Sequence, residues 1–372
     1  MKDLSLILIC KNETQDLINL FESIKGIDCD IHVAFNGDSK ETEDILKRYG
    51  ANIHPWVWTN SFAEARTYAL SFSTTPYFFW LDADDTVSDV QAFNRNFEKM
   101  KAENADVMYI NYHYEHDEAG FASVIIGRER VLKASNAKWV VNKTDMSDCL
   151  EPVEGKWESF YAKDFFINHN MQSKSDSERA ERNLSMTEAA YKNKTSPKAS
   201  MYYAQALKLN HRLNESIPYF IEGLADNEKD QEHQLYIYGE LITALIDIKR
   251  YDEALDWCDK AEKDFPTIGL WSFKRCRLYV ILEQWGKVIE CFEKGFELEM
   301  PDETFIAIYP REWDYYPNLS YALALSKLGR YEQACQVIMS TLERYQKDVH
   351  LNELLKECLI NIKNNMQERK LQ

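Results

Sequence analysis

The stretch Tyr77–Asp85 reads Tyr-Phe-Phe-Trp-Leu-Asp-Ala-Asp-Asp and joins an unbroken apolar run to a cluster of carboxylates. Five consecutive apolar residues predict a buried strand of the kind found in parallel sheets. Open α/β sheets bind their ligands at the carboxyl ends of strands, where these acids fall. In an extended segment, Asp82 and Asp84 point to the same side. A divalent cation, Mg²⁺ or Mn²⁺, could join both to a diphosphate; the alternative is a solvated acidic turn.

The composition indicates a globular protein of two domains. The chain has 372 residues, 45% apolar and 13% aromatic, which is enough for two cores of ordinary size. Its net charge of −17 makes the surface as a whole repel nucleic acid and anionic lipid.

The cysteines and apolar stretches indicate where the protein works. The eight cysteines are scattered without a Cys-x-x-Cys pair, which argues against a zinc site and for a reducing compartment. The first apolar stretch, Leu4–Cys10, is too short for a signal sequence or a membrane span, and no later stretch is long enough. We therefore expect a cytoplasmic protein that does not enter a membrane.

Up to about residue 170, short apolar runs alternate with amphipathic segments. The pattern predicts the strands 4–10, 31–35, 53–58, 77–81, 106–114, 123–132 and 164–169, and the helices 13–25, 39–49, 61–72 and 89–102. Alternation of this kind is typical of a parallel sheet with right-handed crossovers, a nucleotide-binding architecture. The segment 134–160 is weakly periodic and has the length of a functional lid or binding loop.

From about residue 199 the chain is helical and repeats itself. Bulky residues that start similar pentapeptides, Leu213, Tyr251, Trp285 and Tyr331, are 38, 34 and 46 residues apart. A period near 34 with a Tyr-x-x-Ala pattern resembles the tetratricopeptide repeat, whose helix pairs stack into a solenoid. The longest interval holds an aromatic insertion, Phe305–Pro317, which serves either recognition or packing between repeats. We expect domains at 1–170 and 199–372, joined by a polar linker or helix at 171–198.

Four motifs in the first half occur together and in a fixed order. They are Lys11–Glu13, Trp58–Arg66, Trp80–Asp85, and His169 before a polar helix with Arg179, Arg182 and Asn183. With the repeats behind them, the chain resembles a family 2 glycosyltransferase of GT-A fold, in the bacterial subgroup that carries a C-terminal tetratricopeptide domain. That subgroup includes the cysteine S-glycosyltransferases that modify peptides. The resemblance implies an α/β GT-A domain followed by an all-α repeat domain.

The resemblance also implies the nucleotide-binding residues. Asn12 and Glu13 are expected beneath the nucleotide, and Arg66 beside the diphosphate or the acids, for which its guanidinium is well shaped. The family usually has Val-Asp-x-Gly-Ser after the second strand, but this chain has Ala34–Asp38, Ala-Phe-Asn-Gly-Asp. Phe35 therefore replaces the acid that binds uracil. It could stack on a base, with Asn36 or Asp38 as a substitute partner.

The metal site and the catalytic base follow from the same resemblance. Asp84 is expected as the main ligand of Mn²⁺ or Mg²⁺, with Asp82 near the ribose or the metal and His169 completing the coordination. The reaction implied is inverting transfer, in which a carboxylate removes the acceptor proton. Glu151 is the first candidate for this base, with Asp148 and Glu154 behind it; the histidine expected before the glutamate is Leu150 here.

Three functions are open at this point. The first is a glycosyltransferase that moves a sugar, with a UDP-sugar expected as donor, to a peptide, protein or glycan held by the repeat domain. The second transfers a sugar to hydroxymethylated bases of phage DNA, against which the net charge of −17 argues mildly. The third is a binding module with an inert transferase half. A homodimer through the repeat domain is a further expectation.

Overall fold

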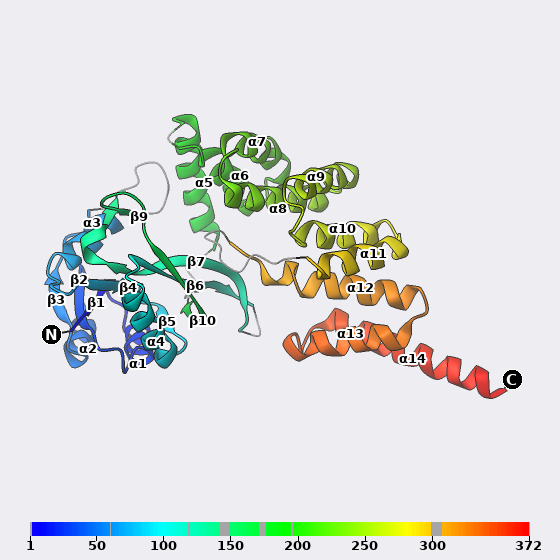
Figure 1. Cartoon of the computed structure of the whole chain (residues 1–372), viewed down its shortest axis with the longest axis horizontal. Coiled ribbons are helices and arrows are strands. Elements are labelled where there is room, and N and C mark those ends of the chain that lie inside the picture. Colours follow the sequence, from blue (N-terminus) through cyan, green and yellow to red (C-terminus); the bar gives the residue numbers. More distant parts are fainter. Residues whose placement is uncertain are drawn as a thin grey trace. The chain divides into compact units, whose positions relative to one another are not determined.

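The computed structural model describes residues 2–59, 61–117, 120–140, 149–170, 176–194, 196–298 and 307–371. The chain divides into two compact units, residues 1–115 with 124–196, and residues 116–123 with 197–372. Figure 1 shows strands up to β10 and only helices after α5. The expected order, an α/β domain followed by an all-helical repeat region, is confirmed.

The first unit is built on one eight-stranded sheet with the strand order β3-β2-β1-β4-β7-β6-β10-β5. Its strands are β1 (Leu4–Cys10), β2 (Asp30–Phe35), β3 (Asn52–Pro55), β4 (Tyr77–Trp80), β5 (Asp85–Val87), β6 (Val107–His116), β7 (Ala122–Lys133) and β10 (Ser159–His169). β3, β2, β1 and β4 are mutually parallel, whereas β7 is antiparallel to β4 and β5 is antiparallel to β10. The sheet is therefore mixed rather than parallel throughout.

Both faces of the sheet are buried, which explains the unbroken apolar runs. Leu6 and Leu8 of β1 face one core with α1 (Gln15–Ser23), α2 (Lys40–Arg48) and α4 (Val90–Ala102). Ile7 faces the opposite core with α3 (Phe62–Leu70).

Side-chain caps fix where three of these helices begin. Ser39 accepts a hydrogen bond from Thr42 N, Ser61 from Glu64 N, and Asp89 from the amides of Gln91 and Ala92. Each cap satisfies amides that have no partner within the helix.

The segment expected as one long functional loop contains regular secondary structure among its described residues. It holds a 3₁₀ turn (Ala134–Asn136) and the strands β8 (Ala137–Val140) and β9 (Cys149–Pro152), which form a two-stranded antiparallel sheet. The expected linker contains helix α5 (Asp176–Lys192). The third strand ends at Pro55 rather than residue 58, since it pairs only with β2, from His32 to Phe35.

The second unit consists of helix pairs that repeat in sequence order. They are α6 (Ala199–Leu209) with α7 (Leu213–Asp226), α8 (Gln231–Asp247) with α9 (Tyr251–Asp264), α10 (Leu270–Ile281) with α11 (Trp285–Phe296), and α12 (Tyr315–Lys327) with α13 (Tyr331–Arg344), before α14 (Val349–Leu371). The first helices of successive pairs also contact each other, α6 with α8, α8 with α10, and α10 with α12. This stacking is that of a tetratricopeptide-like solenoid.

The same kind of turn joins the first helix to the second in each of the four pairs. His211, Lys249, Glu283 and Gly329 have positive φ, at 59°, 64°, 55° and 76°. The residue after each donates its amide to a carbonyl five residues earlier, for example Arg250 N to Leu245 O at 2.9 Å. This pattern is that of a helix C-cap with a left-handed residue. The turn occurs in all four pairs at the same place, whereas the side-chain pattern of the repeat varies from pair to pair.

Candidate functional site

The motifs of the first unit meet at one edge of the sheet. β1 lies between β2 and β4, so the chain passes to opposite sides of β1, and open α/β sheets bind ligands at such a point. The segments after these three parallel strands contain Asn12 with Glu13, Asn36, and the acids from Asp82 onward. The structure thus brings together motifs that are far apart in the sequence.

Asn12 and Glu13 shape the loop that follows β1. Oδ1 of Asn12 accepts hydrogen bonds from the amides of Asp38 (3.0 Å) and Ser39 (3.1 Å), and its Nδ2 donates to Oδ1 of Asp38 (2.8 Å). Oε2 of Glu13 accepts a hydrogen bond from the amide of Lys11 (2.6 Å). The Asn12 side chain therefore ties the loop after β1 to the loop after β2.

The loop after β2 approaches β1 so closely that only glycine fits. A Cβ on Gly37 would lie 1.7 Å from the carbonyl oxygen of Lys11. Phe35 is the last residue of β2 and is half-buried against the core, and Asn36 donates its amide to Cys10 O at 3.0 Å. Phe35 and Asn36, predicted as nucleotide contacts, thus lie directly beside the end of β1.

Arg66 and Asp82 form a partly buried ion pair. Nη2 of Arg66 lies 2.6 Å from Oδ1 of Asp82, and the guanidinium lies over the rings of Trp80 (4.6 Å) and Trp139 (4.9 Å). Burial alone would raise the pKa of Asp82, but the charges of Arg66 and Arg130 hold it below its usual value. Asp82 is therefore an ionised carboxylate engaged by arginine.

Asp84, Asp85 and His169 form a second group, in which one ligand atom of each lies within 4.8 Å of the others. Nδ1 of His169 is 3.4 Å from Oδ1 of Asp84 and 3.1 Å from Oδ1 of Asp85. Burial, with the charges of Asp85 and Asp82, raises the pKa of Asp84 to about 6. Burial lowers the pKa of His169, but its hydrogen bond to Asp85 and the nearby acids raise it overall. Carboxylate oxygens suit both Mn²⁺ and Mg²⁺, and the imidazole nitrogen favours Mn²⁺ of the two, so the donor set fits the expected ion.

This group is completed by residues for which no role was predicted from the sequence. Asp85 ends the quoted acidic run, and Tyr112 and Arg130 contribute from β6 and β7, where they contact Asp85. The available clue was the charge of Arg130 directly before the apolar Val131 and Leu132. Asp82, expected near the ribose or the metal, is not in the group and faces Arg66 instead.

Two of the candidate bases, Glu151 and Glu154, lie among the described residues, and both are exposed. Glu151 is exposed on β9 opposite Lys138 of β8, while its neighbour Leu150 is buried opposite Trp139. Successive residues of a strand face opposite sides, so Glu151 points away from the core side that Trp139 and Leu150 occupy. Glu154 is exposed and donates its amide to Asn136. Asp148 lies outside the described residues.

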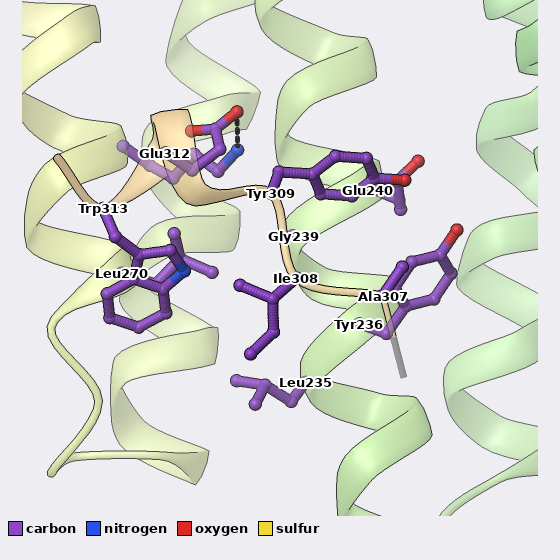
Figure 2. A pocket seen from close by; sticks show the side chains of 11 residues that line it. Leu235, Tyr236, Gly239, Glu240, Leu270, Ala307, Ile308, Tyr309, Glu312 and Trp313 are labelled. Carbon is purple, nitrogen blue, oxygen red and sulfur yellow. Dashed lines mark ion pairs between the residues drawn. The ribbon is translucent and has the colours of Figure 1, made fainter. Parts of the chain in front are cut away.

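The second unit contains a pocket of its own, shown in Figure 2. It lies between α8, α10 and the segment 307–313. The wall is mainly apolar, with Leu235, Leu270, Ile308 and Trp313.

Ion pairs neutralise the charges at the pocket. Lys274 is 2.8 Å from Glu312, and Glu240 is 2.8 Å from Lys208. The aromatic residues of the insertion differ in their surroundings. Trp313 lines the pocket, whereas Tyr315 is buried and its hydroxyl donates a hydrogen bond to Asp348.

Among the residues that the structure describes, no helix has the length and apolar character needed to span a membrane.

Comparison with known proteins gives a family match for residues 5–146. Residues 5–146 match the family model of Glycosyl transferase family 2. No curated protein matches the chain.

Solved structures similar to this chain match about half of it, and two of the three described here are tetratricopeptide proteins. One is a thermophilic tetratricopeptide protein in Thermus thermophilus, 19% identical, whose match covers 50% of this chain and 92% of that protein with a TM-score of 0.36. Another, from Parabacteroides merdae ATCC 43184, is 15% identical, with coverage of 52% and 70% and a TM-score of 0.39. MamA from Desulfovibrio magneticus RS-1 is 13% identical, with coverage of 47% and 96% and a TM-score of 0.34.

The match to the family model spans β1 to β4 and the acidic segment, which are the elements that build the sheet edge described above. Residues 5–146 therefore carry a family 2 glycosyltransferase domain, so the protein is a glycosyltransferase, and a tetratricopeptide-like helical repeat region follows that domain.

Proposed function

We propose that this glycosyltransferase is metal-dependent and inverting, and transfers a sugar from a nucleotide-diphosphate donor to a polypeptide acceptor. The observation that carries the proposal is the pairing of Asp82 with Arg66 beside the group of Asp84, Asp85 and His169. A diphosphate needs positive charge on one side and a ligand for its counter-ion on the other, and this edge of the sheet offers both.

Each residue of the site has a distinct part in this proposal. Asp84 and His169 would hold Mn²⁺ or Mg²⁺, which when bound offsets the charge that develops on the leaving diphosphate. Arg66 is held in place by Asp82 and the two indole rings, so its remaining N–H groups can meet phosphate oxygens without reorganisation. Asn12, Glu13, Phe35 and Asn36 surround the place proposed for the nucleotide, with a UDP-sugar as the first donor to test.

Glu151 is our proposed base, with Asp148 second. Its support consists of two facts: Glu151 is exposed, and it belongs to the two-stranded sheet whose opposite, buried face contacts the Arg66 guanidinium through Trp139 (4.9 Å). A carboxylate exposed there is open to an acceptor, whose proton it can take.

The pocket of the second unit supports a polypeptide as acceptor. Its wall is aliphatic and aromatic, and the charges of Lys274 and Glu240 are already paired, so it suits a neutral apolar side chain. A glycan would need many more free polar groups, and a nucleic acid would need unpaired cations.

The test is a panel of nucleotide sugars with and without Mn²⁺, read by donor hydrolysis and by thermal shift. A bound donor at about 100 times its dissociation constant stabilises the folded protein by about 2.7 kcal/mol. We expect one donor, a UDP-sugar first, to stabilise the protein only when Mn²⁺ or Mg²⁺ is present. Donor binding and hydrolysis that are unchanged by removal of divalent ions would refute the metal-dependent mechanism.

A further inference from the structure

Asp85 is fully buried, and both of its side-chain oxygens are engaged. Oδ1 accepts a hydrogen bond from the Tyr112 hydroxyl (2.8 Å) and lies 3.1 Å from Nδ1 of His169. Oδ2 accepts a hydrogen bond from the backbone amide of Asp82 (2.9 Å) and lies 3.2 Å from Nη1 of Arg130. Four groups, three of them on the strands β6, β7 and β10, therefore fix the orientation of this one carboxylate.

Arg130 provides the counter-charge for Asp85 inside the protein. Its side chain is 1% exposed and lies between the rings of Trp80 (3.8 Å) and Tyr112 (4.1 Å). Nη1 also donates to the carbonyl oxygen of Trp80 at 3.2 Å. A buried ion pair of this kind costs much when one partner is removed, so the two residues hold each other in place.

These contacts make Asp85 a poor metal ligand, although it lies within the group of three. Each oxygen already lies within 3.2 Å of two polar neighbours, and a cation could reach it only by displacing groups that would then be buried without partners. Asp84 differs, because its side chain is 30% exposed and can turn toward a ligand.

The geometry of His169 gives Asp85 a different role. The strand register places His169 directly opposite Asp85, and the ring of Tyr114 stacks on the imidazole with a centroid distance of 5.4 Å and an interplanar angle of 7°. A neutral histidine whose Nδ1 faces a carboxylate carries its proton there, which leaves the lone pair on Nε2.

We infer that Asp85 is a positioning residue that holds His169 in the tautomer protonated at Nδ1, so that Nε2 is the atom presented to the cation. Through the amide of Asp82, the same carboxylate fixes the backbone of the acidic loop. The inference rests on the metal site proposed above, but the tautomer of His169 is a property of the metal-free protein and is measurable by itself.

The first measurement is the tautomer of His169 in the full chain without metal. Protein labelled with ¹⁵N-histidine is recorded by long-range ¹H–¹⁵N spectroscopy at a pH high enough that the ring is neutral, above the raised pKa of His169, and His169→Gln assigns the signal. We expect a protonated Nδ1 and an unprotonated Nε2. A proton on Nε2 in the unaltered protein would overturn the inference, and this result needs no variant to fold.

The second measurement compares two double variants that leave no unpaired buried charge. Asp85→Leu with Arg130→Met replaces the ion pair by apolar groups of similar size, an exchange that buried pairs often tolerate. Asp85→Asn with Arg130→Met keeps an oxygen that can accept from Nδ1. We expect the leucine variant to mix tautomers and to bind Mn²⁺ about 10–100 times more weakly by calorimetry, and the asparagine variant to recover most of both.

The outcomes separate this inference from the proposed function. Wild-type tautomer and Mn²⁺ affinity in the leucine variant would show that Asp85 does not position His169. Failure of the unaltered protein to bind Mn²⁺, with the tautomer as expected, would instead refute the proposed metal dependence and leave the pairing of Asp85 with His169 standing.

Discussion

At the residue scale, two acids only two positions apart have opposite environments. The Arg66 and Arg130 charges hold the pKa of Asp82 below its usual value, although its burial acts in the other direction, whereas burial raises the pKa of Asp84 to about 6. Neighbouring carboxylates whose pKa values are driven apart in this way commonly have different tasks. Asp82 is therefore suited to hold Arg66, and Asp84 gains most from a nearby cation.

Asp84→Asn should abolish metal-dependent transfer while the protein stays folded, because it removes an anionic ligand without changing shape. Loss of several kcal/mol of charge stabilisation lowers the rate roughly a thousandfold or more. Steady-state rates at saturating Mn²⁺ measure the effect, and Asp28→Asn, which changes an exposed acid paired with Lys2, is the control. Near-normal turnover of the Asp84 variant would contradict the assignment.

Glu151→Gln should slow transfer to the acceptor far more than it weakens donor binding, because a general base acts on the acceptor proton. Loss of a general base typically lowers the rate by about 10²–10⁴. Transfer and donor affinity are measured side by side, with Glu158→Gln as a matched change at another exposed acid of the same segment. Equal losses in both quantities would place Glu151 at the donor instead.

Asp84 could be predicted from the sequence because it follows an apolar run that ends at the edge of the sheet, whereas His169 was expected from the resemblance to the family. Tyr112 and Arg130 were not predicted. Both lie within strands, where an arginine or tyrosine looks like an ordinary outward-facing residue. Their role depends on Asp85, which is 27 positions from Tyr112, and a pairing of that range exists only in three dimensions.

At the element scale, strands formed by long apolar runs were predicted from the sequence, whereas the short strands β5, β8 and β9 were not. β1, β2 and β4 lie where the apolar runs predicted them, because burial on both faces requires such runs. β5 has three residues and begins with Asp85, and β8 and β9 have four residues each. Their strand structure comes from the partner strand rather than from their own composition.

At the four recurring turns, a substitution to glycine and a substitution of glycine by alanine should change the free energy of unfolding in opposite directions. Lys249 and Glu283 adopt a left-handed conformation that costs a non-glycine residue roughly 1 kcal/mol. Lys249→Gly should therefore raise the free energy of unfolding by up to about 1 kcal/mol, and Gly329→Ala, at the equivalent turn, should lower it by a similar amount. Urea unfolding followed by circular dichroism measures both, and shifts of the same sign would contradict the shared turn geometry.

At the scale of the whole molecule, the two units divide the proposed work between donor and acceptor. The residues proposed for donor and metal all belong to the first unit, and the apolar pocket belongs to the second. The experiment that separates the two activities compares transfer to a peptide with slow hydrolysis of the donor by water.

Trp313→Ala, which removes part of the pocket wall, should raise the Michaelis constant for a peptide acceptor and leave donor hydrolysis unchanged. Gly239→Leu, which adds a side chain where the pocket is open, should act in the same direction. Phe296→Ala is the control, because Phe296 is 77% exposed and does not line the pocket. A parallel fall of hydrolysis and transfer in the Trp313 variant would make this segment packing support.

The helical unit is discontinuous in sequence, and this affects how the gene can be divided. Residues 116–123 belong to this unit, where Asp117 forms an ion pair with Arg311 at 3.2 Å and the Arg344 guanidinium lies over the Phe121 ring. A clone that starts at residue 197 would lack both the carboxylate that pairs with Arg311 and the ring that Arg344 covers. Chimaeras that exchange helical regions between transferases should therefore carry this short segment along with the C-terminal half.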